Sequence, residues 1–199
     1  MSMRIKFLKS RKIGSLAIMG PAIALGAIAV SIMFSPWFRW QDNAISDLGV
    51  HDVAPLFNAS LVVCGILCSI FALSVILRMK SWHGRTGVLL VLLSSASLVG
   101  IGIFHENIRP WHYIFSVLFF VLLLLACLVL GSYLLRSRQT RYLGVFALAT
   151  AVVGIIGWSI DWGSGIAIPE AISFVPGGIW FILLGHFYRN NNLPFNIQL

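Results

Sequence analysis

Side chains that can transfer protons or bind metal ions are concentrated in three short stretches between long apolar runs. Asp47 lies in the first stretch, His105 and His112 flank the second, and Asp161 lies in the third. Carboxylates and imidazoles can act together as general acid and base, so these four are the candidate catalytic residues. Imidazole with carboxylate is also a workable ligand set for zinc or another divalent ion. Asp47, His105 and His112 are therefore candidate metal ligands, without any HExxH-like fixed spacing to support them.

Five further residues near these four are the candidate substrate-binding residues. They are Ser46, Asn58, Glu106, Arg109 and Glu170. Ser46 and Asn58 are also residue types that cap helices, so a purely structural role is an open alternative for each. A carboxylate or imidazole at a membrane boundary costs free energy unless it is paired or hydrated. We therefore expect the four catalytic candidates to converge in one polar pocket, supported by Ser46, Asn58, Glu106 and Glu170. The alternative is a hydrogen-bonded cluster without a metal ion.

The long apolar runs must provide the elements that position these side chains. Of the 199 residues, 59% are hydrophobic and 10% charged, and the mean hydropathy is +0.94. This composition excludes a soluble enzyme, a disordered chain and a disulfide-stapled secreted domain. Six apolar stretches are each long enough to cross a bilayer, which takes about 20 residues. They lie near residues 14–35, 57–79, 86–104, 112–135, 142–160 and 169–188.

The spans are predicted to be helices, because a run such as 117–130 lacks the apolar–polar alternation of a transmembrane barrel strand. The predicted fold is an all-α integral membrane protein, a bundle of six transmembrane helices over residues 14–188. Residues 1–13 form a basic cytoplasmic tail and residues 189–199 a short cytoplasmic tail. Pro176 and the two glycines after it predict that the sixth helix is bent or unwound there, where it could open around a ligand.

The distribution of charge predicts the orientation in the membrane. Twelve of the 14 Lys and Arg residues lie on one side of the six spans, and only Arg39 and Arg109 lie on the other. The positive-inside rule then places both termini in the cytoplasm of a multi-pass cell-membrane protein, with all six acidic residues outside. The net charge of +8 is thus a topology signal, and no nucleic-acid partner is expected. Three cysteines within apolar runs indicate neither a disulfide nor a metal site.

Several segments resemble the uncharacterised prokaryotic membrane family called domain of unknown function 998. They are Asn-Ala-Ile-Ser-Asp-Leu-Gly at 43–49, Leu-Phe-Asn at 56–58, Gly65, and Gly-x-Phe-His-Glu at 102–106, which leads to His112 and a Phe-rich helix. The resemblance covers nearly the whole chain and implies the six-span layout, but the family has no established activity to transfer. The Ser-Asp loop and the histidine hairpin are also similar to the Frag/DRAM/Sfk group of eukaryotic six-span proteins. That group includes a factor in GPI-lipid remodelling, which implies a role with lipids.

Three functions remain open from the sequence. In the first, the protein binds or modifies a membrane lipid or lipid-linked molecule at the outer leaflet, with Arg39 or Arg109 able to contact a phosphate. The second is a small-molecule or proton-coupled transporter, against which the spans carry almost no charge at mid-depth. The third is a structural or assembly subunit without a ligand. An outer pocket at the polar residues would favour the first function, a continuous central cavity the second, and the absence of both the third. Enzymatic activity and oligomeric state stay open.

Overall fold

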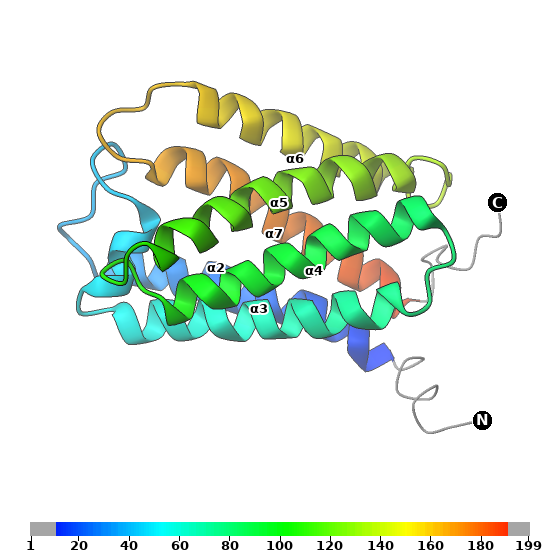
Figure 1. Ribbon diagram of the computed structural model, residues 1–199, viewed down its shortest axis with the longest axis horizontal. Coiled ribbons are helices and arrows are strands. Elements are labelled where there is room, and N and C mark those ends of the chain that lie inside the picture. Colours follow the sequence, from blue (N-terminus) through cyan, green and yellow to red (C-terminus); the bar gives the residue numbers. More distant parts are fainter. Residues whose placement is uncertain (1–10, 191–199) are drawn as a thin grey trace.

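A computed structural model describes residues 11–190, which form six long α-helices and one short 3-10 helix (Figure 1). The elements are α2 (Arg11–Met33), η1 (Ile45–Val50), α3 (Ala54–Ile76), α4 (Trp82–Ile103), α5 (Trp111–Leu134), α6 (Arg141–Ser159) and α7 (Ala167–Arg189). All six α-helices are long and apolar enough to cross a membrane, and residues 11–190 contain no strand. The predicted all-α six-span fold is confirmed. The largest difference in a boundary is at α4, which begins at Trp82 instead of residue 86.

The six helices form a closed ring in chain order. Each helix packs against the one before and the one after it, α7 packs back against α2, and α5 also touches α7. Consecutive helices run in opposite directions, because each connection joins two helices at the same end of the bundle (Figure 1). At the closure of the ring, a Cβ added to Gly14 of α2 would lie 2.8 Å from backbone atoms of Gly185 and Arg189. Glycine here lets the two helix backbones approach closely.

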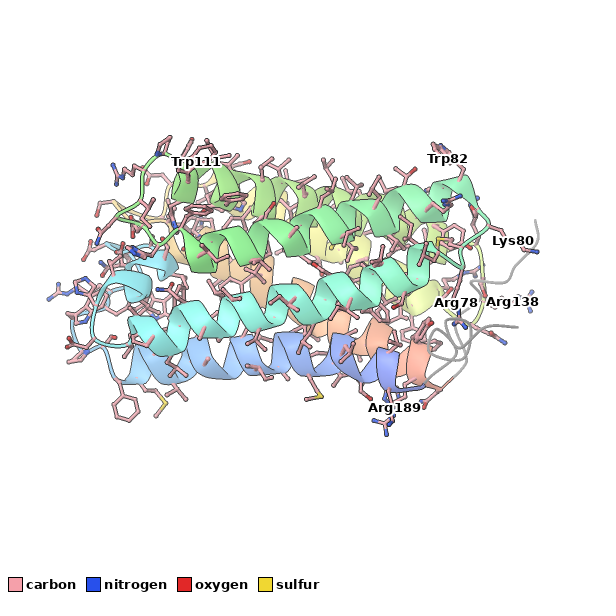
Figure 2. All side chains as sticks on the ribbon, turned by 60° about the horizontal axis from the view of Figure 1, so that its bottom comes forward. Arg78, Lys80, Trp82, Trp111, Arg138 and Arg189 are labelled. Carbon is pink, nitrogen blue, oxygen red and sulfur yellow. The ribbon has the colours of Figure 1, made fainter. Side chains whose placement is uncertain are left out.

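The two ends of the bundle differ in charge. The basic end holds the α3–α4 and α5–α6 connections and the last turn of α7, where Arg78, Lys80, Arg138 and Arg189 gather (Figure 2). The opposite end, which we call the acidic end, holds η1, the other loops and all six acidic residues. The prediction that the basic end faces the cytoplasm remains a prediction, and residues 1–10 and 191–199 of the two predicted tails lie outside the described residues.

The half of the ring toward the basic end is closely packed. Trp180, Phe71, Leu130 and Leu143 are among its largest fully buried side chains. The indole Nε1 of Trp180 donates a hydrogen bond of 3.2 Å to the backbone oxygen of Leu143, so this buried polar group is satisfied. This half therefore forms a solid hydrophobic core.

Of the bend or unwinding predicted for the sixth helix at Pro176, unwinding is wrong, because α7 is continuous from Ala167 to Arg189, and a bend stays a prediction. A Cβ added to Gly177 would lie 3.2 Å from Leu123 of α5, and one added to Gly178 would lie 3.2 Å from Leu25 of α2. The glycines thus fit α7 between its neighbours instead of releasing it. Packing of this kind holds a transmembrane helix together despite the hydrogen bond that proline removes.

Candidate functional site

The loop between α2 and α3 folds over the acidic end of the ring as η1. Ile45 and Leu48 of η1 are buried, with 4% and 0% of their surface exposed. They pack in one apolar cluster with residues of α2, α3 and α4, among them Ile28 and Phe57. The side-chain amide of Asn58 also donates a 2.8 Å hydrogen bond to the backbone oxygen of Gly49 at the end of η1. η1 is therefore a well-anchored cap, and the predicted ligand-binding residue Asn58 has a structural role in holding it.

The α6–α7 connection braces the chain just before this cap. The backbone N–H groups of Ile166 and Ala167 both donate to the backbone oxygen of Asn43, at 3.1 and 2.9 Å. The backbone N–H of Gly165 donates to the oxygen of Gln41 at 2.7 Å. Gly165 fits only as glycine, because an added Cβ would clash with the backbone of Asn43. The start of α7 and the cap are therefore one rigid unit.

Glu170, in the first turn of α7, is the most deeply buried carboxyl of the acidic end. Its side chain is 5% exposed, and its Oε2 accepts a 2.6 Å hydrogen bond from the backbone N–H of Ile45. No Lys or Arg within residues 11–190 forms an ion pair with it. Burying a carboxyl without a cationic partner costs free energy, which makes Glu170 a candidate functional residue.

Asp47 closes the first turn of η1. Its Oδ2 accepts hydrogen bonds from the side-chain amide of Asn43, at 2.7 Å, and from the backbone N–H of Ala44, at 3.1 Å. The amide oxygen of Asn43 in turn accepts from the backbone N–H of Arg39 at 2.9 Å. Asp47 therefore stabilises the cap in addition to any chemical role.

Glu106, in the loop between α4 and α5, pairs with Asp47 across the acidic end. Its carboxyl lies close enough to the Asp47 carboxyl and to Ser46 to interact with both electrostatically. Burial first, and then the Asp47 carboxyl, raise the pKa of Glu106 to about 7, against opposing effects of Arg109 and Ser46. Its Oε2 is buried and has no partner among the described residues. Two carboxyls that share a proton near neutral pH form a group suited to general acid–base chemistry.

The two histidines have different surroundings. His112 is 8% exposed, and its Nδ1 lies 2.8 Å from the backbone oxygen of Phe104. A carbonyl only accepts, so Nδ1 carries the proton, and in the neutral ring Nε2 can accept from the Ser116 hydroxyl at 3.3 Å. His105 is half-buried and its Nδ1 has no partner in the described part of the chain. It lines an open depression of about 360 Å³ between η1, the start of α3 and the α4–α5 loop.

The structure brings most of the predicted site residues together, with one exception. Asp47, His105 and Arg109 all lie close enough to His112 to interact with it electrostatically. Asp161 takes no part in this network. Its side chain is exposed, and it accepts a 3.0 Å hydrogen bond from the backbone N–H of Gly163, two residues along the same loop. Asp161 therefore does not join the other three candidates, because its carboxylate accepts a hydrogen bond from its own loop instead.

The metal interpretation receives no geometric support. Within residues 11–190, no group of three or more His, Cys, Asp or Glu side chains is arranged to hold a metal ion. The Nδ1 of His112 and the Oδ2 of Asp47 are both engaged in hydrogen bonds to the protein. A site built from His105, His112 and Asp47 remains a prediction from the sequence alone.

Beneath η1 the ring contains a partly open cavity of about 130 Å³ that sequence reasoning missed. Its walls come from α2, α3, α4, α5 and α7, and Ser46 and Glu170 line it beside many apolar side chains. Small residues on the inward helix faces create the space, among them Ala24, Ala126 and Gly177. These small residues are visible in the sequence, but in a membrane helix small residues usually indicate close helix packing and not a cavity.

The cavity is long and blind. Along α3 its lining residues run from Phe57 to Cys68, which corresponds to about 16 Å of helix. On α7 they run from Glu170 to Phe181, past Trp180. The core residues nearer the basic end, such as Phe71, Leu130 and Leu143, do not line the cavity, so it ends before it reaches them. The arrangement is a largely apolar tube with a few serine hydroxyls in its wall, and Glu170, the one carboxyl among its described lining residues, lies at the end beneath η1.

Comparison with known proteins identifies the family of this chain. No curated protein and no solved structure matches the chain. The family described as "Protein of unknown function (DUF998)" matches residues 18–186. This range includes nearly all of the ring, the η1 cap, and Asp47, Glu106 and Glu170. The chain therefore belongs to the DUF998 family.

Proposed function

We propose that this multi-pass membrane protein binds one apolar chain of a lipid or lipid-linked molecule in its central cavity, with the polar end of that molecule at Glu170 and Ser46. The observation that carries the proposal is the one-sided polarity of the cavity: its acidic end holds a carboxyl, and its remaining walls are apolar apart from small hydroxyls and thiols. A narrow space about 16 Å long fits a single extended hydrocarbon chain better than a compact solute.

The cost of leaving this space empty supports a ligand over a purely structural role. Protein interiors are close-packed, and unfilled cavities destabilise the fold by about 24 cal/mol per Å³. For 130 Å³ this amounts to roughly 3 kcal/mol. A bundle needed only for assembly would gain stability from larger side chains at Ala24 and Ala126. A bound chain recovers the lost contacts instead.

The blind end of the cavity favours binding over passage through the membrane. Between the cavity and the basic end lies the packed core that contains Phe71, Leu130 and Leu143. Glu170 is the only acidic or basic side chain that lines the cavity within the described residues. A transport route usually presents further ionisable groups or broken helices near mid-depth, whereas α7 is continuous.

In the proposed orientation the acidic end faces the outer leaflet. Trp111 and Trp82 lie at opposite ends of the bundle and are 51% and 79% exposed (Figure 2). Tryptophan prefers the interfacial level, so these rings mark the two membrane surfaces. The Lys and Arg residues at the basic end then place that end in the cytoplasm. A lipid would enter with its head near η1, where the Glu106–Asp47 pair could also transfer protons to it.

Photo-crosslinking of the purified protein tests this proposal. A long-chain alkyl alcohol that carries a diazirine in its tail is expected to label cavity-lining peptides of α3 and α5. Ala24 lines the cavity and Ala22, two residues away, is exposed on the same helix. Ala24→Leu should reduce cavity labelling several-fold because it fills the tube, and the matched variant Ala22→Leu should not. Equal labelling of both variants and the wild type would show that the probe binds only the lipid-facing surface.

A further inference from the structure

We infer that the polar end of the bound molecule is a non-anionic group that hydrogen-bonds to Glu170, such as the hydroxyl of a long-chain alcohol or the ammonium of a long-chain amine, and that phosphate and carboxylate head groups are excluded. This inference rests on the proposed function and specifies the chemistry of its ligand. It follows from the hydrogen bonds and charges at the polar end of the cavity.

Glu170 has one carboxyl oxygen, Oε1, that remains available to a ligand. Its Oε2 is occupied by the Ile45 backbone N–H. Its own backbone N–H is also used, since it donates to the oxygen of Ile166 at 3.1 Å. No hydrogen bond from a residue in the range 11–190 reaches Oε1. Oε1 is therefore the Glu170 atom that a ligand can meet: a hydroxyl can hydrogen-bond to it in either protonation state of the carboxyl, and an ammonium can pair with the ionised form.

Serine hydroxyls are the remaining polar side-chain groups of the cavity wall, apart from two thiols and one indole. The Ser94 hydroxyl donates to the backbone oxygen of Phe119 at 3.1 Å, and the Ser116 hydroxyl lies 3.3 Å from Nε2 of His112. Ser46 lies beside Glu106, and Ser95 is the fourth hydroxyl of the wall. The described wall thus offers single hydroxyls and no Lys or Arg, and it lacks the charged donors that typically bind a phosphate or carboxylate.

The charged residues near the polar end of the cavity disfavour an anionic ligand. Glu170 interacts electrostatically with both Asp47 and Glu106, so three carboxyls surround the polar end of the cavity. The two arginines of the acidic end, Arg39 and Arg109, are exposed and neither lines the cavity. An anion placed beside Glu170 would enter a low-dielectric site whose described lining residues include no cation to compensate its charge. An ammonium would form an ion pair with the ionised form of Glu170, and a hydroxyl would hydrogen-bond to the carboxyl without adding charge.

Competition against the diazirine probe tests the inference with three molecules of equal chain length: hexadecanol, hexadecylamine and hexadecyl phosphate. The protein is held in neutral detergent, and each competitor is added at the same mole fraction in the micelles. The alcohol and the amine should displace the probe, and the phosphate should be at least about tenfold weaker. If the phosphate displaces the probe as well as the alcohol does, the inference is wrong while the proposed function stands. If the probe never labels the cavity, the proposed function itself fails.

A variant pair identifies Glu170 as the discriminating group. Glu170→Gln keeps an oxygen for the Ile45 N–H but cannot form an ion pair, so hexadecylamine should compete several-fold less well while hexadecanol still competes. Asp52 is an exposed acid at the same end, and Asp52→Asn should leave competition by the amine unchanged. An equal change in both variants would assign the selectivity to general surface charge and overturn the role of Glu170. The wild-type competition decides the head-group class even if Glu170→Gln does not fold.

Discussion

The backbone N–H of Ile45 donates a 2.6 Å hydrogen bond to the buried carboxyl of Glu170, which is 125 positions later in the sequence. This bond joins the η1 cap to the first turn of α7 directly at the polar end of the cavity. Cap, helix and cavity are thus coupled through one carboxyl. A change at Glu170 should therefore affect both the fold of the cap and the binding of a ligand.

Glu170→Ala should destabilise the protein by about 1–3 kcal/mol, because it leaves the buried N–H of Ile45 without a partner. Glu170→Gln should cost clearly less, since its amide oxygen can accept the same bond. Thermal unfolding in detergent measures both. Equal stability of the alanine variant and the wild type would mean that the bond does not hold the cap.

Glu106 should make stability fall as the pH rises from about 4.5 to about 7. Its pKa is raised from 4.5 to about 7 in the folded protein by burial and by Asp47, so the folded state holds a proton that the unfolded state has already released. The contribution is full below pH 4.5 and is lost as the pH passes the folded value. Glu106→Gln should flatten this part of the stability profile, and the exposed-site variant Asp52→Asn should retain it. A wild-type profile with the same slope as Glu106→Gln would refute the assignment.

Two glycine substitutions should change stability in opposite directions. A Cβ added to Gly87 of α4 would lie 2.8 Å from Cα and Cβ of Leu130 of α5, whereas one added to Gly26 of α2 would meet nothing within 4 Å. Gly87→Ala should therefore destabilise the bundle by about 1–3 kcal/mol by forcing two helices apart. Gly26→Ala should stabilise it by about 0.5–1 kcal/mol through helix propensity. Unfolding curves of the pair check the close approach of α4 and α5, which a gain in stability for Gly87→Ala would exclude.

Site-directed cysteine labelling tests the orientation. Asn107 and Gln139 are exposed residues in the acidic-end and basic-end loops. In a background without Cys64, Cys68 and Cys127, an impermeant thiol reagent added to intact cells should label Asn107→Cys. Gln139→Cys should react only after permeabilisation. The reverse pattern would invert the topology and move the ligand site to the cytoplasmic leaflet.

The sequence was sufficient for the fold because span length and hydropathy directly determine which segments cross a membrane. It did not reveal the bond from Ile45 to Glu170, since no local pattern reports a contact between segments 125 residues apart. It placed Asp161 in the cluster because loop position alone does not tell which way a carboxylate turns. The unwinding at Pro176 was expected from local chemistry, but Leu123 and Leu25 pack against the following glycines and the helix stays intact.

The cavity was missed for a related reason. Ala24, Ala126 and Gly177 look like ordinary helix-contact residues along the chain, and only their common inward direction in the ring leaves a space. The position of Glu170 in the first turn of α7 was visible from the sequence. Its place at the end of an apolar tube depends on five helices at once.

The most direct test of the central claim is an experimental density map of the protein purified from its native membrane in mild detergent. Our account predicts an elongated density inside the ring that begins beside Ser46 and Glu170 and ends at Trp180. An empty cavity, or one closed by repacked side chains with lipid density only on the outer surface of the helices, would contradict it.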